Sequence, residues 1–241
     1  MEAEIYLNKL TRREFRRRMA SGQLQCCILP VAAVEQHLEH LAMEHDWRSV
    51  NEVARRVAEK LRPRVLVAQA LMVGVSEHHM VHRGTLTLRT GTFLNVLDDL
   101  LDSLVRAGFD HILVLNGHGG NIAPCWNNWD QVLRQHQRNI HFLPYWNVLT
   151  DDDGRELLRG GHRLPQDLPG HAQEFETAIA LAAFAENVRR EAVADQPDPT
   201  PALATAEAGR EFLQRIVERV AQYVEEMLAG LRVAPVPVYH P

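Results

Sequence analysis

The stretch that decides the fold of this chain is residues 35–46, EQHLEHLAMEHD, which follows directly on the apolar run CCILPVAAV of residues 26–34. A short apolar, partly β-branched run that ends in charged side chains predicts a buried strand delivering polar groups to the edge of a sheet. The twelve residues hold three histidines and four acidic side chains. Imidazole and carboxylate groups together form the mixed nitrogen and oxygen set that suits Zn²⁺, Mn²⁺ or Fe²⁺.

Spacing singles out three of these side chains. Glu35 and His37 are two residues apart, so on an extended chain they point to the same side. Asp46 can rejoin them if the residues between loop back. For the remaining charged residues of the stretch, Glu39, Glu44 and His45, we favour a solvated loop that is simply charged.

A second polar segment begins where another apolar run ends. Residues 111–115, HILVL, predict a strand, and residues 116–121, NGHGGN, follow at once. Glycines allow a sharp turn and a close approach to a ligand. The segment lacks both the GxGxxG spacing and the lysine of GxxxxGK[ST], which argues against a nucleotide-binding loop. We favour His118 as a metal ligand, with the backbone N–H groups of Gly119 and Gly120 stabilising an oxyanion.

Apolar periodicity predicts strands that alternate with helices along most of the chain. The predicted strands are 25–34, 64–70, 111–115 and 140–148, and the predicted helices are 11–20, 46–61, 92–106, 122–137, 171–185 and 205–231. This alternation indicates an α/β fold with a mostly parallel sheet covered by helices on both faces. Ligands in such folds bind at the carboxyl ends of the strands, so residues 35–46 and 116–121 are expected on one rim.

The chain is expected to form one domain, residues 1–241. Residues 151–170 are polar, contain Gly and Pro, and predict a long surface loop. The Pro-rich linker 195–201 lies too close to the end to separate a second domain. Residues 234–241 predict an extended tail.

Composition limits the classes of function and partner. A net charge of −5 argues against a nucleic-acid binder, and the arginines of residues 12–18 follow a Thr11–Glu14 capping pattern that predicts a solvated helical face. There is neither an apolar run of the ~18–20 residues that span a membrane nor a signal-peptide pattern. Three cysteines without CxxC spacing predict reduced, buried thiols. We therefore expect a cytoplasmic enzyme without a nucleic-acid or membrane partner.

Taken together, these segments resemble the creatininase family of metal-dependent amidohydrolases. The resemblance rests on Glu-Gln-His at 35–37 with an aspartate nine residues after the histidine, on NGHGGN at 116–121, and on GHAQEFET at 170–177. Weaker similarities are found at residues 77–85 and 204–210. The matching segments occur in the family's order and extend over nearly the whole chain.

The resemblance implies a three-layer α/β/α fold and a site for two divalent metal ions, with Zn or Mn favoured and Fe or Co as alternatives. It implies that Glu35, Asp46 and His118 hold one ion, that His37 and Asp46 hold the other, and that Asp46 bridges the two. It also implies a homo-oligomer, for example a hexamer.

One expected ligand has no counterpart at its usual position. The creatininase that gives the family its name has a glutamate at the position of Gly120, and this glutamate completes the second metal site. We expect Glu174 to supply the missing carboxylate here. The resemblance suggests His171 as the group that protonates the leaving nitrogen, with the alternative that it only neighbours a helix N-cap or orients another group. Glu176 either orients a ligand or takes part in catalysis.

The leading functional hypothesis is a metal-dependent hydrolase that opens a small cyclic amide or related C–N bond with water activated between two metal ions. An alternative keeps the site and opens a cyclic ketone derived from inositol or another polyol. A third hypothesis is a metal-binding scaffold without catalytic activity.

Departures from the family pattern leave the substrate open. Leu38-Glu39 replaces the usual Gly-Pro, VHRGT at 81–85 stands where Phe-Pro-Gly-Thr is common, and Gln173 replaces Gly. All lie where a pocket is expected. Further candidates for this region are His78 and His79, which line the pocket or only its mouth, and His82, Arg83 and Trp47, which are positioned to select a substrate.

Overall fold

A computed structural model describes residues 3–160 and 168–238 of the chain. Its centre is a parallel four-stranded sheet in the order β2-β1-β3-β4. The strands are β1 (Cys26–Val31), β2 (Val65–Val67), β3 (His111–Asn116) and β4 (Asn139–Pro144). The short apolar runs predicted from the sequence form the strands because their side chains are buried on both faces of the sheet.

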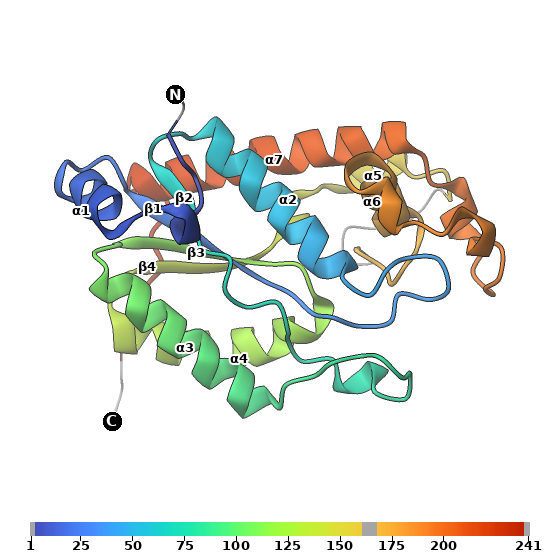
Figure 1. The fold of residues 1–241 in the computed structure, drawn as a ribbon, viewed down its shortest axis with the longest axis horizontal. Coiled ribbons are helices and arrows are strands. Elements are labelled where there is room, and N and C mark those ends of the chain that lie inside the picture. The colour runs from blue at the N-terminus through green and yellow to red at the C-terminus, as the bar shows by residue number, and fades with distance from the viewer. Residues whose placement is uncertain (1–2, 161–167, 239–241) are drawn as a thin grey trace.

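Helices cover both faces of this sheet. They are α1 (Arg12–Ala20), α2 (His45–Lys60), α3 (Thr90–Arg106), α4 (Ile122–His136), α5 (Asp151–Leu157), α6 (Glu174–Ala183) and α7 (Ala206–Leu228). Figure 1 shows α2 and α7 on one side of the sheet and α3 and α4 on the other. Along β1, Cys26 and Ile28 join the core formed with α2, α6 and α7, whereas Cys27 and Leu29 join the core with α3 and α4. The predicted three-layer α/β/α fold is confirmed.

The strand order places the ends of β1 and β3 side by side. The chain moves from β1 to β2 on one side and then crosses to β3 on the other, so the direction of winding reverses between β1 and β3. Val31 at the end of β1 pairs with Asn116 at the end of β3. The two polar segments predicted to share a rim therefore leave the sheet next to each other, at the position where open α/β sheets bind ligands.

Several predicted boundaries differ from the structure. Residues 145–148, predicted as strand, form a 3-10 turn, so β4 ends at Pro144. The predicted loop 151–170 is wrong at its start, because Thr150 and Asp153 form a capping box that begins α5. Residues 161–167 of that predicted loop and 239–241 of the predicted tail lie outside the described residues.

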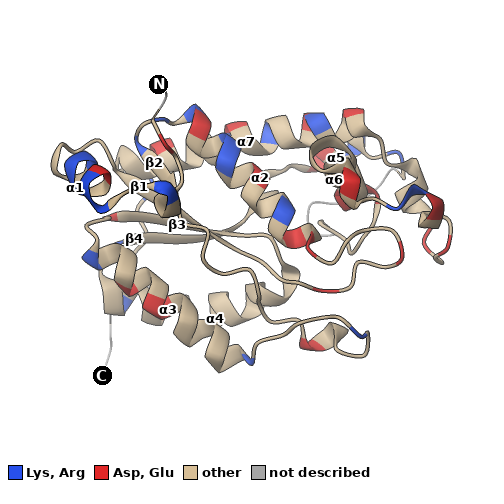
Figure 2. Cartoon of the chain, viewed as in Figure 1, with Lys and Arg blue, Asp and Glu red and all other residues tan. Residues whose placement is uncertain are grey.

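The arginine-rich helix α1 is largely solvated, as predicted. Figure 2 shows Lys and Arg gathered on α1 and interspersed with Asp and Glu along α2 and α7. Arg18 is the exception to the prediction, since it is buried and donates hydrogen bonds to the carbonyl oxygens of Glu4 (2.7 Å) and Pro63 (3.0 Å). The three cysteines are free and buried, as expected. Among the helices of the described residues, none has the length and apolar character needed to cross a membrane.

A close contact at Gly117 fixes the loop after β3 against α2. A Cβ atom at this glycine would lie 2.7 Å from the carbonyl oxygen of Asp46 and 2.8 Å from Cβ of Val50. Only a residue without a side chain permits this approach. The contact holds Asp46, in the first turn of α2, beside His118, in the loop that follows Gly117.

Substitution of Gly117 by alanine tests this contact. We expect Gly117→Ala to lower the free energy of unfolding, measured by urea denaturation, by about 1–3 kcal/mol because α2 must move away. Gly119→Ala is the matched control, since a Cβ there meets nothing within 4 Å, and its effect should stay within about 0.5 kcal/mol. Equal losses in the two variants would contradict the role given to the contact.

Candidate active site

The segments after β1 and β3 bring four predicted site residues together with the start of α2. Glu35 and His37 lie in the loop after β1, Asp46 in the first turn of α2, and His118 between β3 and α4. All four are buried. The ligand atoms of Glu35, His37 and Asp46 lie within 4.8 Å of one another.

Asp46 is the central group of this cluster. Its Oδ1 lies 3.1 Å from Nε2 of His37, and its Oδ2 lies 2.9 Å from Nδ1 of His118. Glu35 Oε1 lies 3.3 Å from the same His118 nitrogen. Each carboxylate oxygen of Asp46 therefore faces a different imidazole, which is the arrangement that a bridging carboxylate requires.

Backbone carbonyl groups fix the orientation of the two imidazoles. His118 Nε2 lies 3.0 Å from the carbonyl oxygen of Val75 and His37 Nδ1 lies 3.2 Å from that of Glu35. A carbonyl oxygen only accepts, so these nitrogens carry the hydrogen. The opposite nitrogens, His118 Nδ1 and His37 Nε2, then face the carboxylates and would present their lone pairs to a metal ion once they lose their hydrogens. Metal-binding histidines are held in the same way in known sites.

Three atoms at the centre of the cluster have no hydrogen-bond partner among the described residues. They are Glu35 Oε2, His37 Nε2 and Asp46 Oδ2, and all three are buried. The Asp46 oxygens lie 3.1 Å and 2.9 Å from the nearest nitrogens of His37 and His118, but His37 Nε2 and Asp46 Oδ2 do not meet the angle of a hydrogen bond. Leaving buried polar atoms without partners costs free energy. Divalent cations would satisfy all three atoms, so the donor set fits metal ions in chemistry.

Electrostatics agree with this interpretation. Burial acts to lower the pKa of His118, but Asp46 and Glu35 outweigh it and raise this pKa to about 10. The same balance, with Asp46 as the main partner, raises the pKa of His37 to about 9. Burial acts to raise the pKa of Asp46, but His37 and His118 hold it well below its ordinary value. In the metal-free protein both imidazoles are therefore protonated at neutral pH, and metal ions must displace these protons.

The segment before and within α6 closes the other side of the cluster. Glu176 Oε2 lies 3.7 Å from His37 Nε2 and accepts a hydrogen bond of 2.6 Å from the backbone N–H of Ala172. The ligand atoms of His37, His171 and Glu176 lie within 4.8 Å of one another. Burial is the largest cause that raises the pKa of Glu176 above its ordinary value. Glu176 thus joins the cluster as a buried carboxylate.

Glu174, expected as a metal ligand, lies elsewhere and this assignment is corrected. Its two carboxylate oxygens accept hydrogen bonds from the backbone N–H groups of Arg159 (2.7 Å) and Gly160 (2.8 Å). The reason is helical phase. Helix α6 begins at Glu174, and residues two apart on a helix project about 200° apart, so only Glu176 faces His37.

The position of Gly120 cannot hold a side chain in this structure. A Cβ atom there would lie 2.1 Å from the carbonyl oxygen of Val75 and 2.4 Å from Nε2 of His118. A carboxylate beside His37 must therefore come from another segment, and the structure places Glu176 there. Gly119 and Gly120 line the cavity beside His118, where a backbone N–H can meet a substrate oxygen.

His45 was expected in a solvated loop, and this is wrong. It is the first residue of α2 and is buried, with its ring centroid 5.0 Å from that of His37 and 5.6 Å from that of Phe184. Burial holds its pKa well below the ordinary value. Glu39 is exposed, as predicted, and half-buried Glu44 accepts a hydrogen bond from Asn187.

Glu35, Asp46, His118 and Glu176 of the cluster line a cavity of about 250 Å³. His78, His79, Pro169 and Gly170 complete the walls. Both candidate histidines of the 77–79 segment therefore line the cavity. His82, Arg83 and Trp47, which were candidates for substrate selection, are not among the lining residues.

Several polar residues that support the site were not assigned roles from the sequence. Buried Asn116 donates to the carbonyl oxygen of His118 (2.6 Å), and Asn121 donates to Asn116 Oδ1 and to the carbonyl of Ala32, both at 3.1 Å. Ser76 Oγ lies 3.2 Å from His118 Nε2. The signal for the asparagines was their position at both ends of a glycine loop. Ser76 carried no comparable signal.

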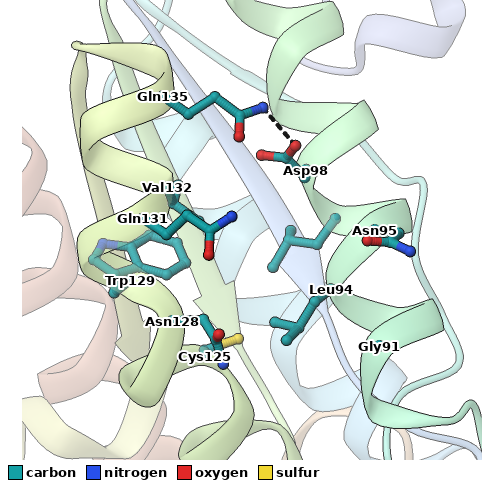
Figure 3. A pocket seen from close by; sticks show the side chains of 11 residues that line it. Gly91, Leu94, Asn95, Asp98, Cys125, Asn128, Trp129, Gln131, Val132 and Gln135 are labelled. Carbon is teal, nitrogen blue, oxygen red and sulfur yellow. Dashed lines mark hydrogen bonds between the residues drawn. The ribbon is translucent and has the colours of Figure 1, made fainter.

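A second hollow lies between α3 and α4 and differs in character (Figure 3). Its titratable lining residues are Asp98 and Cys125. The carboxylate of Asp98 accepts hydrogen bonds from the side chains of Gln135 (2.6 Å) and His136 (2.7 Å). Burial raises the pKa of the Cys125 thiol to about 12. An inert thiol and a fully engaged carboxylate offer no acid, base or nucleophile, so we place the chemistry at the cluster.

The geometry agrees with comparisons to known proteins. A family model described as "Creatininase: Creatinine amidohydrolase" matches residues 8–203, so the chain belongs to the creatininase family and is a hydrolase of that family. The creatinine amidohydrolase of Pseudomonas putida is 28% identical over 211 residues, which cover 83% of this chain and 80% of the relative.

Two other relatives carry different names. The 3-dehydro-scyllo-inosose hydrolase of Thermotoga maritima is 26% identical over 193 residues, covering 79% of this chain and 60% of the relative. The mycofactocin precursor peptide peptidase of Mycobacterium tuberculosis is 29% identical over 217 residues, covering 83% and 86%. Similar sequences thus occur in proteins named for three kinds of substrate.

Solved creatininase structures share the fold and contain metal. A structure described as "Creatininase Mn" has a TM-score of 0.82 and 27% identity, and covers 93% of this chain and 99% of its own. A mutant creatininase of the "Zn-Zn type" also has a TM-score of 0.82, with 26% identity and coverage of 94% and 99%.

Proton release provides a test of the cluster that needs no substrate. Because the pKa of His118 is raised to about 10, that of His37 to about 9 and that of Glu176 to about 8, Zn²⁺ binding at pH 7.5 should release between two and three protons per chain. Release should fall as pH rises through these values. Calorimetry in buffers of different ionisation enthalpy measures it. Binding without proton release would show that the two imidazoles are not displaced by metal.

Proposed function

We propose that this protein is a metal-dependent hydrolase of a small cyclic amide or a related C–N bond, with two divalent ions in the Asp46 cluster. The observation that supports the proposal most strongly is the set of three buried, unpartnered atoms on Glu35, His37 and Asp46. They converge at the carboxyl ends of β1 and β3, where open α/β sheets place their ligands.

The two oxygens of Asp46 divide the cluster into two adjoining sites. His118 faces one oxygen and, with Glu35 beside it, would hold the first ion. His37 faces the other oxygen and, with Glu176, would hold the second. Bound there, divalent ions lower the pKa of a water molecule and polarise a substrate carbonyl. Zn and Mn are the metals named in the similar structures.

The protein's own groups then position the substrate and move the proton. The backbone N–H groups of Gly119 and Gly120 lie at the cavity wall, where they can stabilise charge on a carbonyl oxygen. His171 lines the cavity and would take up the proton that the attacking water loses and deliver it to the leaving nitrogen. Water thus adds across the C–N bond, its oxygen to the carbonyl carbon and a proton to nitrogen.

Metal content distinguishes the proposed ligands. Elemental analysis should find about two ions per chain in the wild-type protein and one or none in Asp46→Ala, because Asp46 serves both sites. Glu176→Gln should retain about one ion.

Glu174→Gln is the matched control for Glu176→Gln, since both remove one buried carboxylate from the first turn of α6. It should keep both ions and lower the free energy of unfolding by about 1–3 kcal/mol, because its hydrogen bonds to the 159–160 backbone weaken. Loss of an ion from Glu174→Gln with none lost from Glu176→Gln would overturn the ligand assignment.

A substrate panel tests the bond that is cleaved. Creatinine and other cyclic amides, 3-dehydro-scyllo-inosose and short peptides should be offered to the Zn²⁺ and Mn²⁺ forms, with cyclic amides expected to react. With a reacting substrate, His171→Ala should lower kcat by about 10²–10⁴ while metal content stays unchanged. Reaction with the cyclic ketone alone would replace the proposed substrate class, and no reaction from a fully loaded enzyme would favour a non-catalytic role.

A further inference from the structure

The side chain of Gln36 lies between two imidazoles at the cavity wall. Its Nε2 is 2.9 Å from Nδ1 of His79 and 2.8 Å from Nε2 of His171. The two rings are stacked, with centroids 4.3 Å apart and an interplanar angle of 23°. One amide group therefore contacts both histidines at once, although they are far apart in the sequence.

The backbone of Leu38 determines which way the amide points. The N–H of Leu38 donates a hydrogen bond of 3.0 Å to Gln36 Oε1. If the amide were reversed, its NH₂ group would face this N–H, and two donors would oppose each other. The NH₂ group therefore faces the imidazoles, and each of its two hydrogens is donated to one ring.

A nitrogen that accepts a hydrogen bond carries no hydrogen. His79 Nδ1 and His171 Nε2 are thus lone-pair nitrogens, and the ring hydrogens lie on His79 Nε2 and His171 Nδ1. These two N–H groups point to the same place, since they lie 3.9 Å and 3.8 Å from Oε1 of Glu35. Both distances are too long for a hydrogen bond. The two donors consequently remain available to an oxygen atom that enters the cavity.

The imidazoles of His37 and His118 are oriented in the opposite way to those of His79 and His171. Backbone carbonyl groups turn the lone pairs of His37 and His118 toward the carboxylates, as metal ligands require. Gln36 does the opposite for His79 and His171, turning their N–H groups inward. Proximity alone would also group His171 with His37 and Glu176 as a potential metal set.

We propose that Gln36 is a positioning residue that holds His79 and His171 as paired N–H donors rather than metal ligands, and that His79 is a substrate-binding residue that contacts a carboxylate or oxyanion oxygen together with His171. This inference deepens the proposed function and rests on it for the identity of the bound oxygen. The tautomers themselves do not depend on metal.

The backbone around Gln36 is built to keep this arrangement. Its N–H donates to Oγ1 of Thr85 (3.1 Å), and Val34 forms a bridge with Leu86. These contacts fasten the 34–36 segment to the loop that carries His79. Leu38, whose N–H donates to the amide of Gln36, adopts a φ of 53°, a conformation that is costly for a side chain of this kind.

Ring ¹⁵N NMR of the full-length, metal-free protein tests the tautomers directly. The chain has thirteen histidines, and His79→Ala and His171→Ala identify the two sets of signals by their loss. We expect the hydrogen on Nε2 of His79 and on Nδ1 of His171.

Gln36→Glu, whose carboxylate only accepts, should move both hydrogens to the opposite nitrogens. A wild-type spectrum with the hydrogens on His79 Nδ1 and His171 Nε2 would overturn the proposal, and so would unchanged tautomers in a folded Gln36→Glu. If that variant does not fold, Gln36→Met takes its place and should give mixed tautomers.

Metal and acetate binding test the assignment as donors. Zn²⁺ content should be unchanged in His79→Ala and His171→Ala and should fall in His118→Ala. Loss of Zn²⁺ from either of the first two would make that residue a ligand and contradict the inference.

Acetate, added to the Zn²⁺-loaded protein as a simple carboxylate, should bind about tenfold more weakly in His79→Ala and in Gln36→Glu, with exposed His82→Ala as the unaffected control. Equal acetate affinity in all variants would overturn the binding role of His79.

If wild-type protein binds no Zn²⁺, the proposed function fails while the tautomer measurement still decides the role of Gln36. The two failures are therefore distinguishable.

Discussion

The rest of the site depends on the burial of Asp46 between two imidazoles. A carboxylate that is 3% exposed is costly unless positive charge lies close to it. His37 and His118 can provide that charge as protonated rings, but the unpartnered atoms of the cluster remain. Metal ions would supply the charge and the missing partners together. The first turn of α2 adds to this preference, because the N-terminus of a helix favours an acidic side chain.

The fold turns this local requirement into an active site. Reversal of the winding direction between β1 and β3 leaves space at their carboxyl ends, and the two loops that follow contribute Glu35, His37 and His118. Gly117 lets α2 approach so closely that Asp46 reaches both loops. Helix α6 then adds Glu176 from a segment about sixty residues further along the chain. No single segment holds enough ligands, so the site exists only in the folded chain.

Local pattern was sufficient for part of this arrangement. The strands and the residues just after them could be predicted because burial and period are local properties, and Glu35, His37 and His118 follow such signals. Asp46 was joined to them by the resemblance to the family and not by a local signal. The choice between Glu174 and Glu176 could not be predicted, because it depends on the residue at which α6 begins. The role of Gln36 was hidden for another reason: its partners are 43 and 135 residues away.

The close packing at Gly120 explains why the carboxylate beside His37 comes from α6 and not from the loop after β3. The carbonyl of Val75 lies so close that no side chain fits, and that same carbonyl fixes the tautomer of His118. A glutamate at this position would have to displace the carbonyl group that orients His118. Supplying the carboxylate from Glu176 removes this conflict. A second ion, if bound by His37 and Glu176, would also link the loop after β1 to α6 and so fasten the segment that carries His171. The ligand that completes the site would thereby also position the proposed acid.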